Sequence, residues 1–509
     1  MTDQTPELAA RAAEQHVVVI GGGIGGLVAA RECAKVGMPV TLLEASDELG
    51  GAIRRAAVDG IVVDAGAESY ATRGGHVRAL VTALGLEDRV VTPEGGGAWL
   101  DGIPDVGAAP IPKGGLLGIP ENPFQDDVRR VLGQRGVWRA YLDRLRPPLT
   151  IGHEKSLGRL VATRMGEKVR DRLVAPVTAG VYSAHPDDVD VEAVAPGLSA
   201  ALTRVGSLSG AVAVLRGERE QKGAAPGSAV EGLIGGMSTL VDALRADLEE
   251  LGVDIRTSTR VETLARDGAI WEVRVTRPES ESPFGSQFAP DTGAESGKNG
   301  DLSDGDAGPE EFRATGVVVA TSEPAARALL SGHADLGEPA VAPEIEIVTL
   351  VLDAPELDAA PRGTGVLTVP GSRIAKALTH STVKWGWLRE AAAGRHVVRV
   401  SFGSQGEVPA TAALDDADAA QLALAQASAM LGVTLRPEQL VGAHRARHVQ
   451  AQPASVIGSA ERRTAARAAV RAVPGAAAVG AWLAGTGLAQ VVPDAVSETD
   501  RLRRALLFG

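Results

Sequence analysis

Three glycines near the start of the chain have the spacing of a phosphate-binding turn. Gly21, Gly23 and Gly26 follow the apolar run Val17–Ile20 directly. In such a turn the first glycine allows a tight bend, the second lets the backbone approach a pyrophosphate, and the third lets a helix pack closely on a strand. Glu44 lies 23 residues after Gly21, where a carboxylate can accept hydrogen bonds from a ribose diol. The sequence therefore predicts a dinucleotide site.

The elements that must position these residues form a β-α-β unit. The run Val17–Ile20 is a strand, the Ala-rich segment after Gly26 is a helix, and Val40–Leu43 is a second strand that ends at Glu44. The N-terminus of that helix would present free N–H groups and a partial positive charge to phosphates. The glycine pair at 50 and 51 favours FAD over NAD, because backbone without side chains can lie along an extended cofactor.

Composition limits the possible classes of protein. A chain of 509 residues is too long for one hydrophobic core, so we expect two domains. The net charge of −13 argues against a nucleic-acid partner. Cys33 is the only cysteine and the nine histidines are scattered, so we predict no metal site. The N-terminus is polar and no run of 18 apolar residues occurs, which predicts a cytoplasmic protein with at most peripheral membrane contact.

The order of segments predicts an α/β fold. A Rossmann-like cofactor domain should be interleaved with a helical insertion and a sheet-based substrate domain, because strand-like runs recur near residues 345–352, 365–369 and 396–402. We expect the chain to close with a strand from Val479, a glycine turn, and a final helix from Pro493-Asp494 to Leu507. The predicted division is cofactor domain 1–90, 228–335 and 436–509, helical substrate or membrane-side region 91–227, and substrate sheet 336–435.

Residues 278–310 are rich in Ser, Gly, Pro and acidic side chains. Such a segment cannot bury enough apolar surface to offset the entropy lost on ordering, so we predict a disordered insertion.

Several motifs together resemble the porphyrinogen oxidases of haem biosynthesis, within the flavin amine oxidase superfamily. They are the glycine turn, the stretch 44–51, the run 64–70 (DAGAESY), and the closing segment 482–494. The run 173–188 (LVAPVTAGVYSAHPDD) is the most discriminating, because it is similar to this family and unlike amine or carotenoid oxidases. The resemblance extends over nearly the whole chain apart from 278–310. The C-terminal turn departs from the family pattern, since Val491-Val492 precede Pro493-Asp494 where a glycine-rich run is usual.

The resemblance implies FAD as the cofactor. It places the nucleotide along the glycine turn and Glu44, the turn 66–69 beside the flavin, Val261 near the adenine, and Trp385 at the isoalloxazine edge. The implied contacts are Gly21, Gly22, Gly23, Ile24, Gly25, Gly26, Glu44, Ala45, Gly50, Gly51, Gly66, Ala67, Glu68, Ser69, Val261, Trp385, Gly485, Gly487, Val491 and Val492.

Carboxylates of a porphyrinogen call for cations in a protein of negative net charge. Arg73, just after the flavin-side turn, is the first candidate, and Arg204 and Lys376 are further ones. Tyr182 either lines the substrate site or packs in a core. The residues indicate no catalytic base.

The implied reaction is oxygen-dependent, six-electron oxidation of coproporphyrinogen III to coproporphyrin III with release of hydrogen peroxide. Molecular oxygen and a porphyrinogen would be the small-molecule partners, and a ferrochelatase could make transient contact with the protein. Three alternatives remain open: oxidation of protoporphyrinogen IX, a non-catalytic FAD-binding paralogue, and another amine or carotenoid oxidase.

Overall fold

The computed structural model describes residues 4–146, 154–221, 230–276, 310–339, 341, 343–449 and 455–509. The predicted insertion, except for its last residue Glu310, lies outside these ranges.

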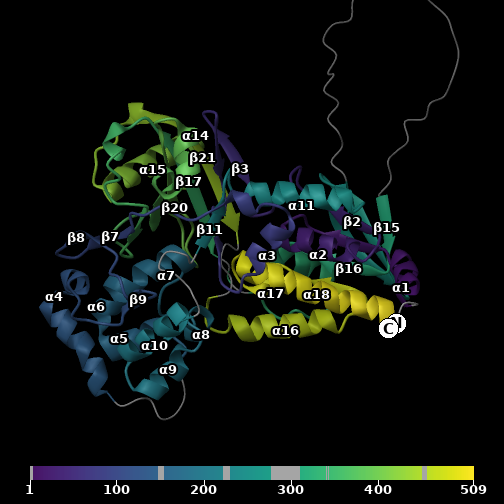
Figure 1. Ribbon diagram of the computed structural model, residues 1–509, viewed down its shortest axis with the longest axis horizontal. Helices are drawn as coiled ribbons and strands as arrows, with labels where there is room; N and C mark the ends of the chain where they lie inside the picture. The colour runs from purple at the N-terminus through teal and green to yellow at the C-terminus, as the bar shows by residue number, and fades with distance from the viewer. Residues whose placement is uncertain are drawn as a thin grey trace, which may run out of the picture.

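A five-stranded parallel sheet forms the centre of the region predicted to bind the cofactor, called the cofactor region below, and confirms the α/β class (Figure 1). All of its strands except the edge strand Asp254–Arg256 are buried at every position, as strands of a parallel sheet covered on both faces must be. Along the sheet the order is β12 (Asp254–Arg256), β2 (Val40–Leu43), β1 (Val17–Ile20), β16 (Gly316–Val319) and β22 (Ala476–Ala478).

Helices cover one face of this sheet, and a second, smaller sheet covers the other. Side chains from α2 (Ile24–Ala34), α11 (Ser238–Glu250) and α18 (Leu488–Phe508) share one apolar core with the strands. The opposite core contains the fully buried Trp271. It is closed by β13 (Arg260–Asp267), β14 (Ile270–Thr276), β15 (Glu310–Ala314), α12 (Glu323–Leu330) and α16 (Ser459–Arg471).

A seven-stranded sheet lies beside the cofactor region and packs one face on α15 (Asp416–Leu431). Neighbouring strands are antiparallel except β18 and β7, which run parallel. The strand order is β21 (Leu440–Val449), β17 (Glu344–Leu352), β20 (His396–Phe402), β19 (Ala377–His380), β18 (Gly365–Thr368), β7 (Ala98–Ile103) and β8 (Gly107–Pro110). The sheet thus takes strands from three of the predicted ranges, 91–227, 336–435 and 436–509.

Short helices make up the third region, at the lower left of Figure 1. They share a separate apolar core and include α4 (Asp126–Tyr141), α5 (Leu157–Met165), α7 (Ala175–Tyr182), α8 (Val191–Val194), α9 (Leu198–Val205) and α10 (Leu208–Gln221). Among the described residues, no single helix has the length and apolar character to cross a membrane. The pair Leu198–Val205 and Leu208–Glu218, bent by 119°, passes that test only when taken together.

The C-terminal segment differs from the prediction. The strand is β22, which ends at Ala478, and a short helix, α17 (Ala481–Ala484), follows it. The last helix, α18, begins at Leu488 and contains Pro493, which was expected at its start. Gly487, at a φ of 95°, is the N-cap, and apolar contacts of α18 with α2 hold the helix together although Pro493 lacks an N–H donor.

Candidate cofactor and substrate site

The glycines of the N-terminal turn divide into two kinds by their surroundings. A Cβ on Gly21, where φ is 108°, would lie 2.7 Å from the Ala320 carbonyl oxygen, and one on Gly26 would lie 1.9 Å from the Gly21 oxygen. A Cβ on Gly23 would meet no atom nearer than 3.9 Å. Gly21 and Gly26 are therefore required by packing, whereas Gly23 exposes its backbone to open space, as a pyrophosphate contact requires.

The N-terminus of α2 fits an anionic group. Its N-cap is Gly23, which supplies no side chain to accept hydrogen bonds from the first N–H groups. Unsatisfied N–H groups and the helix dipole together favour phosphate at this position. The helix itself is almost wholly buried, so the donors are fixed in place.

The Glu44 carboxylate is held at the carboxyl end of β2. The Gly22 N–H donates to Oε2 at 2.6 Å, and the Ser46 N–H and hydroxyl donate to Oε1 at 2.8 and 2.7 Å. These bonds orient a half-buried carboxylate next to the glycine turn. This is the position expected for a ribose-binding acid.

A continuous strip of small residues leads away from this turn. Gly50 donates to the Gly22 oxygen at 2.8 Å, and Gly51 lies against Gly23. Further along, a Cβ on Gly66 would lie 2.0 Å from the Ala52 oxygen. The strip therefore connects the phosphate turn with the turn 66–69, and its length of bare backbone suits an extended dinucleotide.

The Glu68 carboxylate lies at the end of this strip and is paired with two cations. Arg399 Nη1 donates to Oε2 at 3.0 Å, and Lys384 Nζ donates to Oε1. Ser381 Oγ also donates to Oε2, at 3.1 Å. Burial alone would raise the pKa of Glu68, but the charges of Lys384 and Arg399 lower it to about 2. We call Glu68, Lys384 and Arg399 the junction cluster.

The junction cluster ties the flavin-side turn to the seven-stranded sheet. Glu68 follows β4 (Ile61–Asp64) of the cofactor region, whereas Arg399 is on β20 and also donates to the Gly66 oxygen. The indole of Trp385 is buried and packs within 5.0 Å of Lys384 Nζ. A predicted flavin contact therefore lies next to the cluster.

Asp64 is a second buried carboxylate beside the junction cluster. Its Oδ1 accepts the Met237 N–H at 2.9 Å. Burial raises its pKa to about 6, although Arg399 and backbone N–H groups oppose the shift.

The predicted substrate residue Lys376 lies where α7 meets the seven-stranded sheet. Lys376 donates to the hydroxyl of Ser183, the residue after Tyr182. Burial lowers the pKa of Lys376 to about 7. The approach is close because Gly180 lacks a side chain; a Cβ there would lie 2.5 Å from Leu367 Cδ2. Tyr182 packs against the core of the helical region.

One face of the sheet remains partly uncovered. Ladder register puts Arg399 on this face, because side chains alternate and the positions facing away from it form the core with α15. Arg399 itself is buried, but several neighbours on its face are only half-buried. They are Ile347, Thr379 and Ser401, whereas Leu367 and Ala377 of the same face lie next to Gly180 of α7.

The other two predicted cations are exposed. Arg204 is on α9 and pairs with Glu218 of α10 at 3.3 Å, with 62% of its side chain exposed. Arg73 is exposed in the turn after β5 (Tyr70–Ala71). Arg204 is thus already neutralised within the helical region.

The remaining predicted cofactor residues take different roles. Val491 faces the glycines of α2, with Cγ1 3.4 Å from the position of a Cβ on Gly25, whereas Val492 is in the apolar core. Gly485 and Gly487 have φ of 105° and 95° and lie in the turn between α17 and α18. Val261 pairs with Val275 in the three-stranded sheet.

Sequence reasoning did not single out Lys384, Arg399 or Asp64. A signal was present for Arg399, because a charged residue inside the apolar run HVVRVSF is rarely buried without a partner. Lys384 adjoins the predicted Trp385. The partner of both cations is distant in sequence, so only the fold could identify it.

Comparison with known proteins adds the family. The model of flavin containing amine oxidoreductases matches residues 24–289, just over half of the chain. The coproporphyrinogen III oxidase of Propionibacterium freudenreichii is 29% identical over 50% of this chain and 53% of that protein. The enzyme of the same name from Bacillus subtilis is 25% identical over 95% of this chain and 96% of that protein. A crystal structure from Exiguobacterium sp. 255-15, with a proposed protoporphyrinogen oxidase activity, superimposes with a TM-score of 0.78 at 25% identity over 96% of this chain and 98% of that chain.

Proposed function

The chain belongs to the family of flavin containing amine oxidoreductases, and we propose that it oxidises coproporphyrinogen III to coproporphyrin III. Family membership makes it an FAD-dependent oxidoreductase. The observation that supports this substrate is the similarity, over nearly the full length of both chains, to the coproporphyrinogen III oxidase of Bacillus subtilis.

The residues present fit FAD, which would supply the capacity to take up two electrons at a time. The N-terminus of α2 and the backbone at Gly23 would bind the pyrophosphate, and Glu44 the ribose. The turn 66–69, held by Arg399, would orient the flavin end of the cofactor.

The substrate would bind against the uncovered face of the seven-stranded sheet. The half-buried apolar and small side chains there suit a flat macrocycle, and its carboxylates would need cations nearby. We assign carboxylate binding to Arg73, which is exposed after the flavin-side turn, and to Lys376, whose amine lies at the α7 junction. Positioning the ring against the cofactor and excluding water are the tasks left to the chain.

Complete oxidation removes six electrons from the porphyrinogen in three two-electron steps. We propose that oxygen takes the electrons from the cofactor and leaves as hydrogen peroxide. We also propose that the protein acts in the cytoplasm, and that the product passes on to a ferrochelatase by transient contact.

The domain division is also a proposal. We retain cofactor segments at 1–90 and 228–335 and a helical region within 91–227. Because β7, β8 and β21 join the seven-stranded sheet, we assign these strands to the substrate domain with 336–435, and the rest of 436–509 to the cofactor domain.

The test is to purify the chain with FAD and mix it anaerobically with coproporphyrinogen III. Loss of the oxidised flavin absorbance, followed by porphyrin fluorescence after oxygen is admitted, is expected. A flavin that stays oxidised with every porphyrinogen would overturn the proposal and favour a non-catalytic FAD-binding protein.

Protoporphyrinogen IX is the second candidate substrate, supported by the structural similarity to the Exiguobacterium protein. Both porphyrinogens should be compared under the same conditions. A clear preference for protoporphyrinogen IX would replace the first proposal with the second. Reduction of the flavin by an amine would instead indicate an amine oxidase.

A further inference from the structure

The junction cluster contains one buried cation, Arg399, and one half-buried cation, Lys384, for one carboxylate. Exposed fractions of the three side chains are 12% for Glu68, 19% for Lys384 and 8% for Arg399. Glu68 thus balances only one of two positive charges. The Asp64 carboxylate supplies a further negative charge nearby. Protonation of Asp64 removes that charge.

The arrangement of the cluster is fixed by contacts that leave it little freedom. Arg399 bonds both the Glu68 carboxylate and the Gly66 oxygen, and Lys384 is flanked by Glu68 and the ring of Trp385. Ser381 holds the carboxylate from a third direction. Such fixed charges can stabilise a negative charge that develops nearby without reorienting, whereas water molecules would have to reorient.

The strip of small residues leads from the phosphate turn to this cluster. Gly51 contacts Gly23 at one end of the strip, and Gly66 packs on Ala52 at the other. A dinucleotide that begins at α2 and extends along the strip ends beside Arg399 and Lys384. This step depends on the proposed cofactor contacts.

We propose that Lys384, together with Arg399, sets the electron affinity of the bound flavin by placing fixed positive charge beside the turn 66–69. When the substrate loses two electrons and two protons, the flavin takes both electrons and one proton, and the second proton leaves to solvent. The flavin therefore gains one negative charge. A fixed cation nearby favours this change, and loss of that cation opposes it.

Sulfite is a suitable probe, because it tests the charge without a porphyrinogen. Its lone pair forms a bond to the flavin, no group leaves, and the ring gains negative charge. We expect Lys384→Met to raise the sulfite dissociation constant of the FAD-bound protein about tenfold, which corresponds to about 1.4 kcal/mol. Coulomb's law gives an effect of this order for a unit charge about 10 Å away at an effective dielectric constant of about 20.

Three further variants make the result specific. Lys384→Arg keeps the positive charge, so its sulfite dissociation constant should stay near that of the wild type. Lys155→Met removes the same charge from an exposed ion pair with Glu461 and should leave sulfite binding unchanged. Asp64→Asn removes a negative charge and, at pH 8, where Asp64 is ionised, should tighten sulfite binding several-fold.

The measurement separates the possible failures. Equal sulfite affinity in Lys384→Met, Lys155→Met and the wild type would overturn the inference. If Lys384→Met loses its flavin, the sulfite affinity of Asp64→Asn tests the inference instead. A sulfite affinity of Asp64→Asn that is equal to or weaker than that of the wild type would overturn the inference. A wild-type chain that binds no FAD would overturn the proposed function as well. A chain with the expected sulfite shifts but no turnover of porphyrinogens would overturn only the proposed substrate.

Discussion

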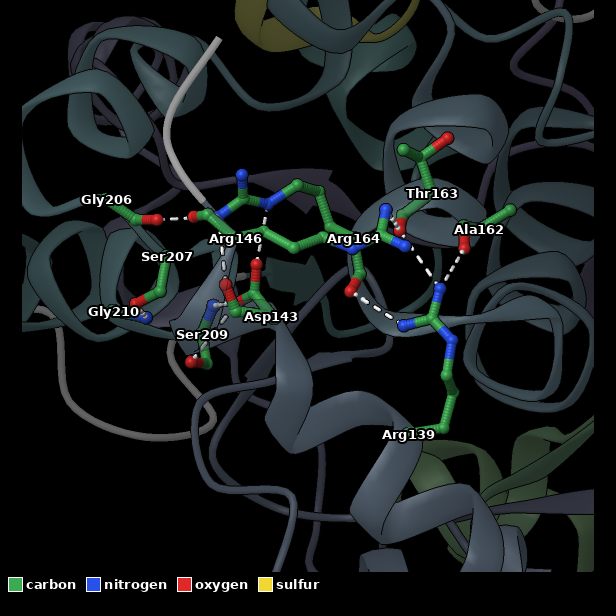
Figure 2. Close-up of polar contacts among 10 residues, drawn as sticks. All are labelled: Arg139, Asp143, Arg146, Ala162, Thr163, Arg164, Gly206, Ser207, Ser209 and Gly210. Atoms are coloured by element: carbon green, nitrogen blue, oxygen red, sulfur yellow. Dashed lines mark hydrogen bonds and ion pairs between the residues drawn. The ribbon is translucent and has the colours of Figure 1, made fainter.

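Two buried carboxylates in this protein are paired in different ways. Asp143, in the helical region, is fully buried and bonds Arg164 Nε at 2.7 Å and the Ser209 N–H at 3.1 Å (Figure 2). Arg164 Nη2 also donates to the carbonyl oxygens of Asp143, Arg146 and Gly206. Glu68 instead meets two cations, Lys384 and Arg399.

The sequence separations of these pairs explain the difference. Asp143 and Arg164 are 21 residues apart and belong to one region, so their pair stabilises a single local core. Glu68 is 316 residues from Lys384 and 331 from Arg399, so this cluster holds two regions together. The local pair brings one cation to one carboxylate, whereas the cluster between regions brings two cations to one carboxylate.

The largest change in the free energy of unfolding is expected on breaking the local pair of Asp143 and Arg164. Asp143→Asn leaves the Arg164 guanidinium buried without a counter-charge and should lower the free energy of unfolding by about 3–5 kcal/mol. Urea denaturation measures the loss. The double variant Asp143→Leu/Arg164→Met removes both charges and should recover much of it. A single variant within about 1 kcal/mol of wild type would show that the pair is not stabilising this region.

A smaller, pH-dependent effect is expected at the junction cluster. Because the folded state lowers the pKa of Glu68 from 4.5 to about 2, its contribution is complete above pH 4.5 and is lost as the pH falls towards 2. The wild type should lose about 2 kcal/mol more stability than Glu68→Gln between pH 5 and pH 3. Urea midpoints of both proteins at the two pH values provide the comparison. Parallel losses in both proteins would contradict the assigned role of Glu68.

The smallest effect is expected at an exposed pair. Arg204→Ala breaks the contact with Glu218, but solvent screens both charges, so the unfolding free energy should change by less than about 1 kcal/mol. We also expect the KM for coproporphyrinogen III to be unchanged, because Arg204 lies in α9, on the side of the helical region away from the seven-stranded sheet (Figure 1). A severalfold rise in KM would restore Arg204 as a substrate-binding residue.

Local patterns predicted much of the fold but not how distant segments join. The turn at Gly21, the helix α2 and the strand before Glu44 were predictable, because periodicity and glycine positions act within a few residues. Pro493 was expected to start the last helix, yet packing on α2 extends α18 to Leu488. The partners of β7 and β21 in the seven-stranded sheet are far away in the sequence, so no local signal could assign them.

The sequence by itself determined the nucleotide turn and the family resemblance, because both depend on residue types at fixed, short spacings. Only the tertiary structure brought Lys384 and Arg399 to Glu68, and α7 to Lys376. Ion pairs and their pKa shifts depend on distance and burial in space. A charged residue in an apolar strand indicates that it has an ion-pair partner. Only the folded structure identifies that partner.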